Sequence, residues 1–88
     1  MKVDILGKPY RVVEATDGQM PDSFGTASCK DQIITLKKSM AAGQKADTML
    51  HEVIHIISNE LALELPEDTI RRLAVGLHSA GVKVAMKK

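Results

Sequence analysis

The segment His51-Glu52-Val53-Ile54-His55 constrains this chain more than any other part of its sequence. Residues four apart on a helix share one face, so both imidazoles can reach a single metal ion. In the H-E-x-x-H spacing the glutamate lies beside the metal without ligating it. Zn²⁺ lowers the pKa of a bound water from ~15.7 to ~7, and Glu52 can accept the proton of that water. The motif therefore predicts a helix that carries a metal site.

The residues around the motif favour a metal over a chance match. H-E-x-x-H also occurs by chance on helices, where both histidines are ordinary surface or core residues. Here the motif is surrounded by apolar residues: Met49, Leu50, Val53, Ile54, Ile56 and Ile57. Burying an unpaired polar group costs roughly 2–7 kcal/mol, so a His-Glu-His set in such a helix needs a partner. A metal ion would be that partner.

Composition limits the other classes of function. The 88 residues suit one domain, residues 1–88, and with 2% aromatic residues its core must be aliphatic. A net charge of +1 gives no electrostatic case for binding nucleic acid or a membrane surface. No apolar run approaches the ~20 residues of a membrane span, and the N-terminus has no signal-peptide pattern. We therefore expect a cytoplasmic protein.

The chain has one cysteine, Cys29, so an internal disulfide is impossible and a reducing compartment suits it. A lone cysteine can be a nucleophile or a metal ligand. More often it is a small buried hydrophobe, and that is what we expect of Cys29.

Local patterns predict an α+β fold. Strands are expected over residues 2–6, 10–15, 24–29 and 33–37, the first two forming a hairpin around Gly7-Lys8-Pro9. The motif helix is expected to start between Gln44 and Asp47, with Asp47 as N-cap or near the positive end, and to run to about Leu63. A second helix is expected from Pro66 to about Ser79, closed by Gly81. Residues 82–86 suit either a short strand or a tail.

A catalytic zinc usually has three protein ligands, so the two histidines need a third. Ile70, Ala74 and Leu77 form an apolar stripe on the second helix, and Glu67 extends that stripe toward the first helix. The competing explanation is that glutamate in a first turn simply favours the helix dipole. Glu64, in the hinge, is the fallback ligand. His78 lies ~16 Å along the helix from Glu67, too far to share the ion.

Thr48 to His55, followed by Leu65-Pro66-Glu67-Asp68 and Leu73-Ala74-Val75-Gly76-Leu77, resembles small phage- and prophage-associated metallopeptidases related to the ImmA/IrrE family, which are zincin-like gluzincins. The segment 25–36 resembles the edge strand beside the active-site helix of that group. The resemblance covers roughly residues 24–78. This chain has Glu67-Asp68-Thr69-Ile70 where the family often has a denser E-x-E-A pattern, and it carries no helix-turn-helix module.

The resemblance implies a minimal zincin-like fold, with a small, mostly antiparallel twisted sheet packed against the H-E-x-x-H helix and a second C-terminal helix. It implies His51, His55 and Glu67 as Zn²⁺ ligands and Glu52 as general base. We therefore expect a zinc-dependent metallopeptidase whose peptide or protein substrate pairs with an edge strand near residues 33–36. A regulatory protein such as a phage repressor is the substrate that the resemblance suggests.

Other interpretations stay open at this stage. Tyr10 and His78 are the residue types available to stabilise an oxyanion. The main alternative is a non-catalytic, metal-stabilised protein-binding module of phage origin, in which Glu64 or Cys29 closes the site as a fourth ligand. A metal-free α+β module is a third. His and Glu ligands also accept other divalent ions, so the ligand types alone do not single out zinc.

Overall fold

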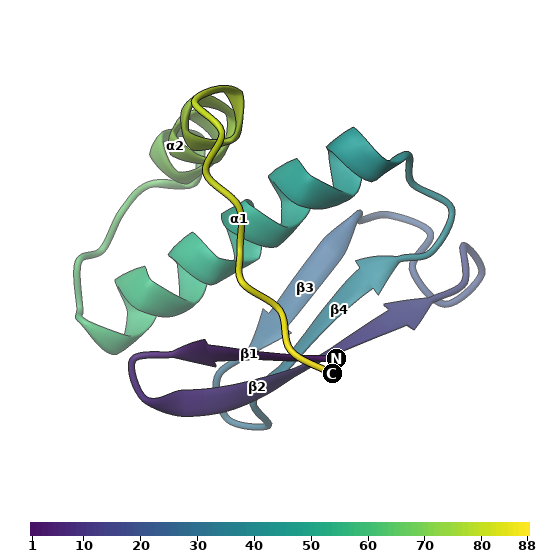
Figure 1. Ribbon diagram of the computed structural model, residues 1–88, viewed down its shortest axis with the longest axis horizontal. Coiled ribbons are helices and arrows are strands. Elements are labelled where there is room, and N and C mark those ends of the chain that lie inside the picture. The colour runs from purple at the N-terminus through teal and green to yellow at the C-terminus, as the bar shows by residue number, and fades with distance from the viewer.

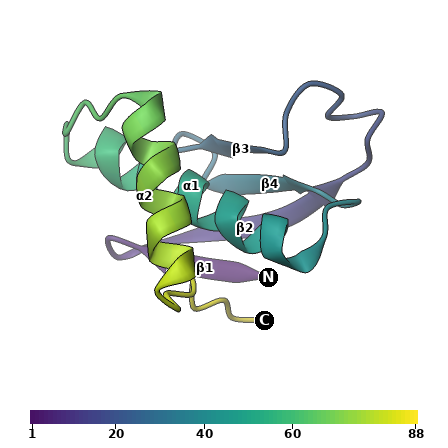
Figure 2. The ribbon, with the colours of Figure 1, turned by 90° about the horizontal axis from the view of Figure 1, so that it is seen from above.

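The computed structural model describes residues 1–88 and shows a sheet covered on one face by a helix, on which a second helix packs (Figure 1). In chain order the elements are β1 (Lys2–Ile5), β2 (Lys8–Ala15), β3 (Gly25–Ser28), β4 (Ile33–Lys37), α1 (Ala42–Glu60) and α2 (Glu67–Ser79). α1 packs on β1, β3 and β4, whereas α2 packs on α1 alone and crosses it (Figure 2). The expected α+β class is confirmed.

The sheet is mixed, with strand order β1-β2-β4-β3. β1–β2 and β3–β4 are antiparallel, as expected, but β2 and β4 run parallel, from the pair Arg11 and Ile33 to the pair Ala15 and Lys37. The prediction that residues 33–36 form an edge strand is wrong, because β4 pairs on both sides. The open edge is β3, while a single bridge from Lys2 to Lys87 lies against β1.

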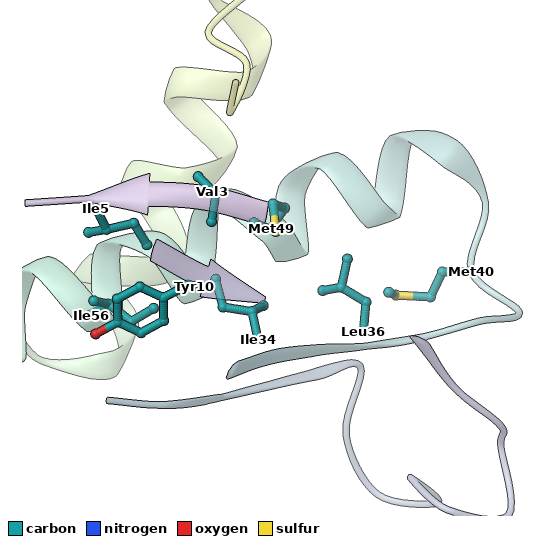
Figure 3. Close-up of a cluster of buried hydrophobic side chains, with 8 residues drawn as sticks. All are labelled: Val3, Ile5, Tyr10, Ile34, Leu36, Met40, Met49 and Ile56. Carbon is teal, nitrogen blue, oxygen red and sulfur yellow. The ribbon is translucent and has the colours of Figure 1, made fainter. Parts of the chain in front are cut away.

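The core lies between the sheet and α1 (Figure 3). Burial alternates along β1 and β4, so every second side chain of these strands faces the helix. The central cluster holds eight buried side chains: Val3, Ile5, Tyr10, Ile34, Leu36, Met40, Met49 and Ile56. As the composition requires, it is aliphatic apart from Tyr10, and two flexible methionines fill it beside the start of α1.

α1 begins earlier than the sequence suggests. Its first residue is Ala42, preceded by an extended Ala41 that provides no side-chain cap. The prediction of Asp47 as N-cap is therefore wrong, because the helix begins five residues before it, directly after the segment that buries Met40. Asp47 lies in the second turn of α1, beyond the first turn where a carboxylate favours the helix dipole, and its carboxylate accepts a hydrogen bond from His78 Nδ1 at 2.6 Å.

α2 ends as expected. Gly81 has a φ of +90°, its N–H donates to His78 O, and the N–H of Val82 donates to Leu77 O. These two bonds form a Schellman motif that requires a left-handed residue at Gly81. The chain then continues without a strand over residues 82–86, which settles the choice left open by the sequence. Neither helix combines the length and the apolar character needed to cross a membrane.

Tyr10 is the only tyrosine, so its ionisation can be followed by absorbance while the protein unfolds at high pH. Burial raises the pKa of Tyr10 from 10.0 to about 12, and the neighbouring Cys29 thiol adds to the shift. Because the pKa is higher in the folded chain, the stabilisation is complete below pH ~10 and is lost as the pH rises toward 12. Absorbance of the phenolate should therefore appear together with loss of the native circular dichroism, above pH 11. Titration near pH 10 in a still-folded protein would show that Tyr10 is accessible.

Candidate metal centre

α1 brings the two motif histidines together. His51 and His55 are one turn apart, their ring centroids are separated by 4.8 Å, and their Nε2 atoms lie 3.1 Å apart. Both side chains are partly exposed. Because the two ring nitrogens point at one place on the helix surface, a single cation could accept a lone pair from each.

Glu67 reaches the same place from the first turn of α2. Its Oε1 lies 2.6 Å from His51 Nε2, and its Oε2 lies 2.7 Å from His55 Nε2. As the stripe predicts, Ile70 and Ala74 are buried against α1, and they turn Glu67 toward it. Leu77, expected on the same stripe, is 37% exposed, because α2 packs only on α1 and its far end stays open to solvent.

The turn between the helices holds Glu67 in position. α1 ends at Glu60, earlier than the expected Leu63, because Ala62 and Glu64 both take left-handed backbone conformations. Ser58 is buried, and its hydroxyl accepts a hydrogen bond from the N–H of Leu65 at 3.1 Å. The backbone carbonyl of Ser58 accepts a second hydrogen bond, from the N–H of Leu63 at 2.9 Å. The last turn of α1 is thus tied directly to the segment that starts α2.

Glu52 lies beside this group but points toward the sheet. It is 8% exposed, and burial raises the pKa of its carboxyl, while His51 and His55 act in the opposite direction. The edge strand comes close at this point because residue 25 is glycine. A Cβ on Gly25 would lie 2.6 Å from Thr48 Cγ2 and 3.3 Å from Glu52 Oε2. The missing side chain therefore lets β3 pass directly over Glu52.

The donor set fits a zinc ion. Two imidazole nitrogens and one carboxylate oxygen are a common set of three protein ligands for zinc. Around a tetrahedral ion with bonds of ~2.0–2.1 Å, ligand atoms are about 3.3 Å apart. The observed separations of 2.6, 2.7 and 3.1 Å would each have to open, by less than about 1 Å, to reach this value. Glu67 is 65% exposed, so this side of the group faces solvent and leaves room for a further ligand.

The other candidate residues are not brought into this group. The atoms that converge belong to His51, His55 and Glu67 alone, so neither Glu64 nor Cys29 closes the site as a fourth ligand. Cys29 is half-buried and packs against the core, as expected of a small hydrophobe. Two further candidates lie elsewhere: Tyr10 is fully buried, and His78 is paired with Asp47.

Sequence reasoning missed three residues that shape the site. Asn59 continues the row of His51 and His55 by one more turn, so helical spacing could have found it. Ser58 and Gly25 gave no usable signal, because the role of each depends on which segment the fold places against it.

Comparison with known proteins adds no further constraint. No protein-family model matches this chain, and no curated protein or solved structure matches it. The interpretation of the site therefore rests on its geometry and chemistry.

The close approach at Gly25 can be tested by adding one methyl group. Gly25→Ala should destabilise the fold by roughly 1–3 kcal/mol, because the new Cβ must push Thr48 or the whole strand away from α1. Gly76→Ala is the matched control, since its Cβ meets nothing within 4 Å and should stabilise α2 by about 0.5–1 kcal/mol. Urea denaturation gives both values. Equal stability of Gly25→Ala and the unmodified protein would contradict the close contact.

Proposed function

We propose that this protein is a zinc-dependent metallopeptidase. The observation that carries the proposal is the convergence of His51, His55 and Glu67 from two helices, with the buried carboxylate of Glu52 beside them. A structural ion pair would explain contact between one histidine and Glu67. It does not account for the second histidine, whose Nε2 lies 3.1 Å from that of the first and 2.7 Å from the other carboxylate oxygen of Glu67.

His51, His55 and Glu67 would hold the metal, and Glu52 would move the proton. When bound, Zn²⁺ supplies Lewis-acid chemistry that acidifies water and polarises a carbonyl. Glu52 accepts the proton of the attacking water and delivers it to the departing amine nitrogen, which breaks the peptide bond. Burial raises the pKa of Glu52 above its ordinary value, which makes its carboxylate a stronger base.

The open edge of β3 supports binding of an extended peptide. The N–H of Lys37 donates to Phe24 O, so in this antiparallel ladder Phe24, Thr26 and Ser28 face β4. The backbone N–H and C=O groups of the alternate residues, Gly25 and Ala27, therefore point away from the sheet. An added strand could pair with them directly over Glu52. β3 takes the place that the sequence assigned to residues 33–36.

The resemblance to the ImmA/IrrE family extends the proposal to a cytoplasmic regulatory protein, such as a phage repressor, as substrate. The second candidate is a metal-stabilised protein-binding module without turnover. It is favoured by the same open edge, which would capture a partner strand whether or not hydrolysis follows.

Matched substitutions separate these functions. Zinc affinity of the chelator-stripped protein, measured by calorimetry, should fall at least tenfold in Glu67→Gln, because a carboxylate ligand is lost. Glu64→Gln, the control in the adjoining turn, should leave the affinity unchanged. Glu52→Gln should retain zinc but reduce hydrolysis of a quenched-fluorescence peptide library by about 10²–10⁴-fold.

Each result decides one point. Equal zinc affinity in the two glutamate variants would remove Glu67 from the site. Tight zinc binding by an unmodified protein that cleaves no peptide would contradict the peptidase and leave the binding module.

A further inference from the structure

A pocket of about 390 Å³ lies between β3 and α1. It adjoins the candidate metal centre, because His55 lines both. Glu52 and His55 form one end of it. The remaining walls come from the edge strand and from the last two turns of α1, through Ala27, Cys29, Ile56 and Asn59. A peptide paired with the edge of β3 would have this pocket beside the bond that is cleaved.

Asn59 is the polar group of the pocket that is free to bind a substrate. It lies one turn beyond His55 on the same face of α1, and it is exposed. Its Nδ2 donates to Cys29 Sγ at 3.3 Å, and a thiol is a weak acceptor. This bond orients the carboxamide but is readily exchanged. The amide oxygen and the second N–H of Asn59 are left for a ligand.

The surrounding charges favour a neutral side chain. The carboxylate of Glu52 at one end of the pocket would repel an acidic group. A basic side chain would pair with Glu52 and occupy the group that has to accept a proton. A carboxamide, by contrast, can both donate to and accept from Asn59, and its bonds leave Glu52 free.

The direction of β3 fixes which residue of the substrate enters. Gly25 lies against Thr48 and Glu52, whereas Cys29 contacts Asn59, so β3 runs along α1 in the same direction. An antiparallel substrate strand would place its N-terminal part at the Asn59 end. The pocket then lies on the N-terminal side of the scissile bond.

We propose that this pocket binds the side chain of the residue immediately before the scissile bond, and that Asn59 selects asparagine or glutamine there. The inference rests on the proposed function and names the substrate class of the same site. Asn59 acts here as a specificity residue, through hydrogen bonds with the substrate amide.

Cleavage profiles test the proposal. Peptides that vary only at the residue before the cleaved bond are offered to the unmodified zinc-loaded protein, to Asn59→Leu and to Asn59→Asp. The preference for glutamine over leucine should fall about tenfold in Asn59→Leu, because the hydrogen-bonding partner is replaced by a methyl-bearing side chain of similar size. Asn59→Asp should shift the preference to lysine and arginine. Gln44→Leu, which removes an exposed amide near the other end of α1, should leave the profile unchanged.

A second readout does not depend on turnover. In the zinc-loaded Glu52→Gln protein, a glutamine peptide should slow alkylation of Cys29 by iodoacetamide, since Cys29 lines the pocket. The alanine analogue of this peptide should protect less, and Asn59→Leu should remove the difference. An unmodified protein that cleaves peptides with a profile unaffected by Asn59→Leu would overturn the inference alone. Absence of both cleavage and protection would overturn it together with the proposed function.

Discussion

The contact between α1 and α2 at Glu67 is the constraint on which the site depends. α2 touches no strand, so its position depends on its packing on α1, on the short turn between the helices and on the tail that bonds to β1 at Lys87. Ile70 and Ala74 supply the apolar part of that contact, and the Ser58 hydroxyl ties the turn to the last turn of α1. A metal ion held from both helices would fasten the one element that the main core does not reach. In a chain of 88 residues, such a link would add stability that a small aliphatic core cannot supply.

The His51, His55 and Glu67 side chains also lie where a substrate could reach them. The three converging side chains lie at the surface, with Glu67 exposed, while Glu52 is buried under the edge strand. The Glu52 carboxylate held in this way lies beside the converging side chains, on the side of β3. The separation of these roles follows from helical spacing, because His51 and His55 share a face and Glu52 projects from its edge. Because residue 25 is glycine, β3 can also come within van der Waals contact of α1 and cover Glu52.

What the sequence predicted well depends on interactions between residues close in the chain. The His51–His55 pair, the stripe through Ile70 and the closing Gly81 follow from helical geometry or local backbone conformation. Glu67 was predicted because it extends the apolar stripe, and the structure places it against both histidines. The start of α1 was misjudged since a tertiary contact, the burial of Met40, outweighed the capping preference of Asp47.

Strand order was beyond local reasoning. The segment 33–37 has the strongest strand character, yet β-propensity does not distinguish a central strand from an edge strand. The parallel pairing of β2 with β4, which moves β3 to the edge, is a long-range choice that local patterns do not record. Gly25 and Ser58 went unnoticed for the same reason, because each matters only through the segment that folds against it.

Zinc K-edge X-ray absorption on the protein loaded with one equivalent of zinc would show directly whether His51, His55 and Glu67 hold the ion. We expect one retained ion with nitrogen and oxygen ligands at about 2.0–2.1 Å and the scattering pattern of two imidazoles. We expect no sulfur at about 2.3 Å, because Cys29 lies outside the converging group. Failure to retain zinc after dialysis at neutral pH, or a sulfur ligand in the spectrum, would contradict a centre built from His51, His55 and Glu67.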